Sequence, residues 1–117
     1  SKVKLGGEIV NSLPLALDLR LNFLDSNGNV VPLAEGCGVQ KIAPCNLDAS
    51  ASVTPLEIVL AGKEGVNADI ASLELMFNAN SAGVAGIPVT EDAYLQAVLQ
   101  LVLPEGITVD LKDIMKE

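Results

Sequence analysis

The sequence predicts an all-β domain, a two-sheet antiparallel β-sandwich with an immunoglobulin-like arrangement of seven to eight short strands. Three observations lead to this prediction. Several segments of strand length alternate apolar and polar residues, turn-forming residues separate these segments, and the 117-residue chain is 50% hydrophobic but only 3% aromatic. Alternation puts the apolar residues on one face of a strand, and short strands between turns are typical of a sandwich. The length suits one domain, spanning residues 1–117.

The clearest strand follows Pro14. Its apolar residues occupy every second position and are expected to be buried: Leu15, Leu17, Leu19, Leu21 and Phe23. The polar residues between them are expected on the outer face: Asp18, Arg20 and Asn22. A helix would place these polar residues on the leucine stripe, so the pattern favours a strand.

The turn after this strand comprises residues 25–29, DSNGN, all of them turn formers. A two-residue loop would place Phe23 opposite a proline. A three-residue loop with Gly28 in the left-handed conformation puts apolar residues opposite each other in two pairs, Phe23 with Val31 and Leu21 with Leu33. We therefore predict the three-residue loop, because a one-residue slip would exchange the two faces.

Four other segments show alternation or a short apolar run. They predict strands over residues 2–10, 39–42, 49–61 and 107–111. Pro55 inside the third segment indicates an edge strand or a strand that starts late. Residues 71–78 alternate as well, although a helix capped by Asn67 or Asp69 is the alternative there.

The stretch Tyr94–Leu103 fits two templates. As a strand, it would line one face with Leu95, Ala97, Leu99, Leu101 and Leu103. As a helix, it would be capped by Thr90, with Glu91 and Asp92 in the favourable first turn. The residues alone leave both possibilities open.

The charge and hydropathy of the chain exclude several kinds of partner. The net charge is −8, and the seven basic residues are not clustered. Nucleic acid and anionic membrane surfaces are therefore not expected as partners. The chain contains no run of 18 apolar residues, which is about the length that a membrane-spanning helix needs.

Cys37 and Cys45 are the only cysteines. A disulfide between them is expected, because the intervening segment contains Gly38 and Pro44, which allow the chain to turn back. Such a bridge would indicate an oxidising compartment. Two free thiols are the alternative.

The residues needed for common catalytic and metal sites are missing. The chain has no histidine, which excludes a Ser-His-Asp triad and any metal site that contains histidine. Residues 25–29 lack the glycine and glutamate positions of a calcium-binding EF-hand loop, so a hairpin turn is favoured. Glu91, Asp92 and Glu105 are interpreted as solvated or capping carboxylates, and Tyr94 as a surface residue of a strand. The chain is therefore expected not to be an enzyme and to hold no cofactor or metal.

The stretch Asn78–Asp92 is the longest irregular segment and the best loop candidate for binding, because long loops on rigid sandwiches often carry recognition. Its small residues offer little for recognition. A crossover between the two sheets is the alternative.

Two stretches, NSLPLALDLRLNFLDSNGNVV and TEDAYLQAVLQLVLPEGITVDL, resemble uncharacterised β-sandwich domains of secreted bacterial lipoproteins. The resemblance covers about a third of the chain. It implies an extracytoplasmic location, periplasmic or at the cell surface, and an anchor to the membrane that lies outside this chain. It also favours the strand for Tyr94–Leu103. It implies no site residues, and Cys37 and Cys45 do not match its pattern.

These observations predict a non-catalytic structural or interaction module of a secreted or surface-anchored bacterial protein. The chain begins at Ser1 rather than methionine, so we expect it to be part of a longer protein. A carbohydrate- or peptide-binding module accessory to another domain is the alternative, and a carrier of an apolar ligand comes after it. The expected partner is an unidentified protein or glycan.

Overall fold

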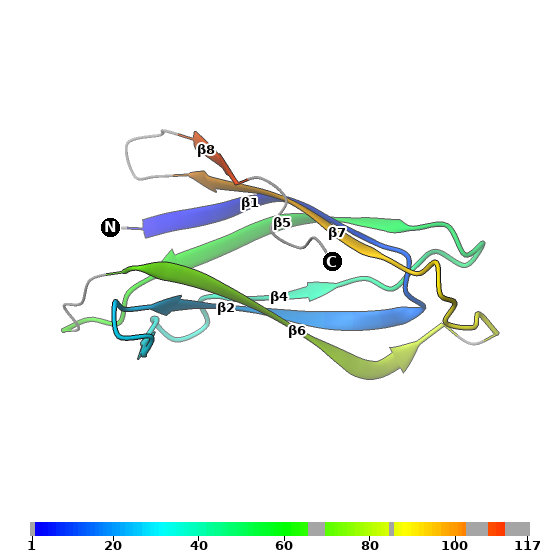
Figure 1. Cartoon of the computed structure of the whole chain (residues 1–117), viewed down its shortest axis with the longest axis horizontal. Coiled ribbons are helices and arrows are strands. Elements are labelled where there is room, and N and C mark those ends of the chain that lie inside the picture. Colours follow the sequence, from blue (N-terminus) through cyan, green and yellow to red (C-terminus); the bar gives the residue numbers. More distant parts are fainter. Residues whose placement is uncertain (1, 66–69, 85, 103–107, 112–117) are drawn as a thin grey trace.

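The structure is a computed structural model that describes residues 2–65, 70–84, 86–102 and 108–111. These residues form eight strands and no helix, and the strands make two antiparallel sheets that face each other (Figure 1). The predicted all-β sandwich is therefore confirmed.

Each sheet is built around one long strand. Sheet A has the order β5-β1-β7-β8, with bounds Ser52–Ala61, Lys2–Asn11, Leu95–Val102 and Thr108–Leu111. In sheet B, β2 (Leu15–Leu24) pairs with β6 (Ser72–Gly83) along one edge. Its other edge pairs with two shorter strands, β3 (Val30–Val31) and β4 (Val39–Ile42).

The strand order departs from that of an immunoglobulin domain. There, the first two strands lie in one sheet and the last two in the other. Here β7 and β8, the last strands, extend the sheet that contains the first strand, β1. The sequence pattern shows which side of each strand is apolar but not which strand lies beside it, so this order could not be predicted.

The core lies between the inner faces of the two sheets. Its buried side chains are Leu5, Ile9, Leu17, Leu19, Leu21, Ile42, Leu56, Ile58, Leu60, Ala97 and Leu99. The three central leucines of β2 are thus buried as predicted. Leu15 and Phe23, nearer the strand ends, are half-buried. On the outer face Arg20 is exposed, whereas Asp18 and Asn22 are half-buried.

The turn after β2 confirms one of the two predicted pairs. Phe23 pairs with Val31, and Gly28 has a left-handed φ of 82°. The Oδ1 atom of Asp25 accepts hydrogen bonds from two backbone N–H groups of the turn, each at 2.9 Å. Because this carboxylate stabilises the turn, its role is structural.

The predicted pairing of Leu21 with Leu33 is wrong. The N–H of Leu21 donates instead to the carbonyl oxygen of Gly38 at 2.7 Å, and Leu33 forms a bridge with Gly62 at the end of β5. Pro32 follows β3 and has no N–H with which to continue the hairpin ladder. The chain therefore leaves β2 at this point and runs toward sheet A.

The segment that follows covers the edge of β5, which confirms the edge position predicted from Pro55. The N–H groups of Ala34 and Gly38 donate to carbonyl oxygens of β5 at 2.8 and 3.1 Å. The side chain of Gln40 donates to the carbonyl oxygen of Pro55 at 2.7 Å and accepts from the N–H of Glu57 at 3.1 Å. These bonds satisfy edge groups of β5 and fix the segment between β3 and β4 in place.

The two ambiguous segments are both strands. Residues 95–102 form β7, with Ala97 and Leu99 buried, so the helix alternative is wrong there; Leu103 lies outside the described residues. The strand predicted at 71–78 is β6, and it continues to Gly83 because β2 offers a partner as far as Leu15. The irregular stretch Asn78–Asp92 therefore contains the end of a strand, and its remainder crosses from sheet B to sheet A.

The disulfide predicted between Cys37 and Cys45 is not formed, and both cysteines are free. The extended strand β4 lies between them, and its four residues alone span roughly 10 Å. A disulfide requires Cα atoms about 4.4–6.8 Å apart. Gly38 does bend the chain, with a φ of 78°, but it directs it along β2 rather than back toward Cys37.

The two thiols are expected to differ in reactivity. Cys37 is half-buried, whereas Cys45 is only 3% exposed. Treatment of the unreduced native protein with a thiol reagent should label Cys37, and labelling of Cys45 should require denaturant. Mass spectrometry of the labelled peptides measures this difference. Absence of labelling in denaturant without reductant would contradict the free thiols.

Candidate ligand-binding groove

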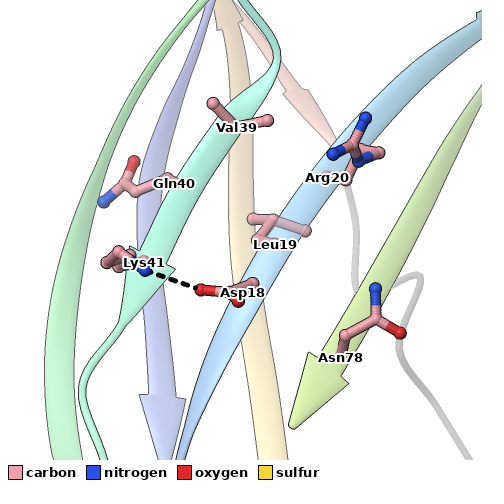
Figure 2. A pocket seen from close by; sticks show the side chains of 7 residues that line it. All are labelled: Asp18, Leu19, Arg20, Val39, Gln40, Lys41 and Asn78. Atoms are coloured by element: carbon pink, nitrogen blue, oxygen red, sulfur yellow. Dashed lines mark hydrogen bonds and ion pairs between the residues drawn. The ribbon is translucent and has the colours of Figure 1, made fainter. Parts of the chain in front are cut away.

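The outer face of sheet B contains a hollow of about 520 Å³. Figure 2 shows its lining residues on three neighbouring strands: Asp18, Leu19 and Arg20 from β2, Val39, Gln40 and Lys41 from β4, and Asn78 from β6. Of these, Leu19 and Gln40 pair with each other and belong to the inner face of the sheet. A second hollow of about 350 Å³ shares Arg20 and Val39 with the first. We call the two together the outer groove.

The register of sheet B brings the polar side chains of the groove together. Asp18 lies between Lys41 of β4 and Asn78 of β6, and Arg20 lies opposite Val39. Residues directly opposite each other on neighbouring strands have Cβ atoms about 4.5–5.5 Å apart, so their side chains interact. The sequence placed Asp18 and Arg20 on one face, but the neighbouring strands supply the rest of the groove.

The second hollow contains several aliphatic residues in its lining. Its lining includes Val30, Val31 and Leu33, together with the Cys37 residue that precedes β4. Val30 is 57% exposed and Val39 is 50% exposed, which is high for aliphatic side chains. Hydrogen bonds from the backbone N–H groups of Ala34 and Gly38 to β5 hold this part of the lining against the edge of sheet A.

Two hydrogen-bonded pairs involve charged groups on this face. The Nζ atom of Lys41 lies 3.2 Å from Oδ1 of Asp18, and the two side chains are 86% and 47% exposed. Farther along β2, the amide of Asn22 donates to the carboxylate of Glu74 at 3.1 Å. Within the described part of the chain, no hydrogen bond or ion pair engages the Arg20 guanidinium.

The ion pair between Lys41 and Asp18 is expected to contribute little to stability. The lysine is well exposed and the aspartate about half exposed, and solvent-screened pairs of this kind contribute about 0–1 kcal/mol. A double-mutant cycle with Lys41→Ala and Asp18→Ala, measured by urea unfolding, should therefore give a coupling free energy below about 0.5 kcal/mol. A coupling above 1 kcal/mol would show that the pair is a structural element of the sheet.

The residues singled out from the sequence lie elsewhere. Glu91 and Asp92 are exposed in the turn before β7, and Glu105 is outside the described residues. Tyr94 is 49% exposed, and its backbone N–H and carbonyl are hydrogen-bonded to Ser12. None of these residues lines the outer groove. The sequence feature that could have indicated the groove is Arg20, the only arginine of the chain, on the polar face of its clearest strand.

One carboxyl group has a perturbed acidity. Hydrogen bonds from the hydroxyl and the backbone N–H of Ser50 lower the pKa of Asp48. Asp48 is fully exposed in the loop between β4 and β5 and does not line the groove. This shift is therefore a property of a local turn.

Comparison with known proteins provides no relative for the chain. No family model, curated protein or solved structure matches it. Among the described residues, no helix is long and apolar enough to cross a membrane. The same residues contain no group of three or more cysteine, aspartate or glutamate side chains placed to hold a metal ion.

Proposed function

We propose that this chain is a non-catalytic interaction module that binds an extended segment of a partner protein in the outer groove. The observation that carries the proposal is the pair of neighbouring hollows on the outer face of sheet B, which share Arg20 and Val39. They combine cationic, amide and exposed aliphatic side chains on strands held rigidly by backbone pairing. Such a combination suits recognition of a polypeptide, which presents both polar and apolar groups.

The chemistry of the groove supports a binding role rather than catalysis. A nucleophile needs a neighbouring general base, and the chain has no histidine to provide one beside Cys37. The groove carboxylate, Asp18, is paired with Lys41. The amide of Gln40 is already bonded to β5, and the remaining polar groups, on Arg20 and Asn78, are suited to hydrogen bonding with a ligand.

The same lining favours a peptide over a carbohydrate. Aromatic side chains provide large, flat surfaces for recognition, but no aromatic residue lines either hollow. The exposed aliphatic residues Val30 and Val39 instead offer contacts for aliphatic side chains of a partner. A carbohydrate ligand is therefore the second candidate.

We also propose an extracytoplasmic bacterial location, with any membrane anchor outside this chain. This part of the proposal rests on the resemblance to secreted lipoprotein domains alone. The free thiols of Cys37 and Cys45 remove the argument from a disulfide.

Selection from a library of random peptides displayed on phage tests the proposed function. The protein is expected to enrich peptides that no longer bind when the groove is blocked by Val39→Trp. The matched control is Val53→Trp, because Val53 is similarly exposed, at 57%, but lies on the outer face of sheet A. The proposal fails if no peptide is enriched, or if every enriched peptide binds the blocked variant as well as the control.

A further inference from the structure

We infer that the outer groove recognises an acidic peptide segment, with a carboxylate of the peptide bound by Arg20. The inference rests on the proposed function and specifies the partner's chemistry. It starts from the position of Arg20, which lines both hollows and therefore lies between them. A ligand that occupies the whole groove must pass this side chain.

The guanidinium of Arg20 is available to a ligand. The side chain is exposed, and its neighbours on the two flanking strands are the uncharged residues Val39 and Met76. A guanidinium presents a rigid fork of N–H donors that matches a carboxylate in a two-bond geometry. No group in the described part of the chain fills that role.

The carboxylates of Asp18 and Glu74, on the same face as Arg20, are engaged by other partners. Asp18, two residues earlier on β2, is paired with Lys41, and Glu74 accepts a hydrogen bond from Asn22. Neither forms an ion pair with Arg20 in this structure. A carboxylate from outside can therefore bind Arg20 without displacing an existing partner.

Lys41 supplies a second cation at the same site. Its side chain is 86% exposed, and among the described residues its ammonium is paired with Asp18 alone, in an arrangement that contributes little to stability. The ammonium has three donors, so it can bind a ligand carboxylate while keeping its bond to Asp18. Asn78, on the other side of Asp18, adds an amide donor.

The overall charge of the chain makes this positive spot selective. With a net charge of −8, most of the surface repels an acidic peptide. The chain has only seven basic residues, and two of them, Arg20 and Lys41, line this groove. An acidic segment is therefore directed to this groove, and its binding should weaken as salt is added.

The aliphatic residues of the second hollow indicate which peptide side chain can accompany the acid. In an extended peptide the side chains at positions i and i+2 lie on the same side, about 6.6–6.8 Å apart. With a carboxylate at Arg20, a nearby aliphatic side chain of the peptide reaches the hollow lined by Val30, Val31 and Leu33. The best ligand therefore combines acidic and aliphatic residues.

Fluorescence polarisation with two synthetic heptapeptides tests the inference. In one, glutamate and valine take turns at the odd-numbered positions with serine between them, and in the other, glutamine replaces each glutamate, so that both side chains lie on one side of the extended peptide. The glutamate peptide should bind the wild-type domain at least about tenfold more tightly, because charge-assisted hydrogen bonds are roughly twice as strong as neutral ones. Arg20→Gln should remove this preference, and Arg20→Lys should restore part of it. Lys4→Gln, on the outer face of sheet A, is the control and should preserve the preference.

The outcomes separate this inference from the proposed function. If phage selection yields groove-dependent peptides but glutamate is not preferred, or Arg20→Gln has no effect, the inference is wrong and the proposed function stands. If neither the library nor either heptapeptide gives groove-dependent binding, both are wrong. An oligogalacturonate that binds through Arg20 more tightly than the glutamate peptide would overturn the peptide assignment in favour of an acidic glycan. Circular dichroism and thermal unfolding of each variant establish that it is folded.

Discussion

Replacing Gly7 with alanine is expected to destabilise the domain by about 4 kcal/mol. Gly7 lies in the middle of β1 with a φ of 111°, a conformation that costs residues with a side chain about 1–3 kcal/mol. A Cβ atom at this position would lie 1.9 Å from the carbonyl oxygen of Val98 on β7. Relief of that overlap requires backbone movement, which costs about a further 1–3 kcal/mol.

The neighbouring glycine provides the matched control. At Gly6 the nearest atom to an added Cβ is the carbonyl oxygen of Leu56, at 4.0 Å, so Gly6→Ala should change stability by less than about 1 kcal/mol. Urea unfolding followed by far-ultraviolet circular dichroism measures both variants. Similar losses at the two positions would show that β1 does not approach β7 as closely as the structure indicates.

Replacing Asn11 with alanine is expected to cost about 3 kcal/mol. Asn11 is fully buried at the end of β1, where the chain passes from sheet A to sheet B. Its amide donates to the carbonyls of Leu15 and Ala43 at 3.2 and 2.9 Å, and its Oδ1 accepts from the N–H of Leu13 at 2.9 Å. Alanine would leave the groups of Leu13 and Leu15 without these partners, at about 1–3 kcal/mol for each unsatisfied buried group.

Two further variants test this role of Asn11. Asn11→Asp keeps the shape but places a carboxylate against two carbonyl oxygens, which favours its protonated form. Its loss relative to wild type should therefore be larger at neutral pH than near pH 4, where the carboxyl group can carry a proton and donate one bond. Asn22→Ala is the control, because Asn22 is only half-buried on the outer face, and its cost should be within about 0.5 kcal/mol. A loss at Asn11 no larger than at Asn22 would disprove the structural role.

The faces of the strands could be predicted from the sequence. Alternation in β2 is enough to place Leu17, Leu19 and Leu21 in the core, because a period of two is a property of the extended backbone itself. The left-handed Gly28 and the pairing of Phe23 with Val31 also follow from local information, since a short loop fixes the register of its own hairpin.

The neighbours of each strand were decided by the tertiary structure. β1 lies between β5 and β7, and the segment after β3 attaches to β5 instead of continuing along β2. This attachment to β5 separates Cys37 from Cys45. The hydrogen bonds of Asn11 likewise depend on where β2 begins and where β4 ends.

The groove has the same origin. Arg20 was predicted to face outward from its strand alone, but Val39, Lys41 and Asn78 join it only because β4 and β6 pair with the two edges of β2. The physical reason is that the backbone period repeats identically in every strand. It therefore determines which way a side chain points, whereas the partner across the sheet depends on the packing of the whole chain.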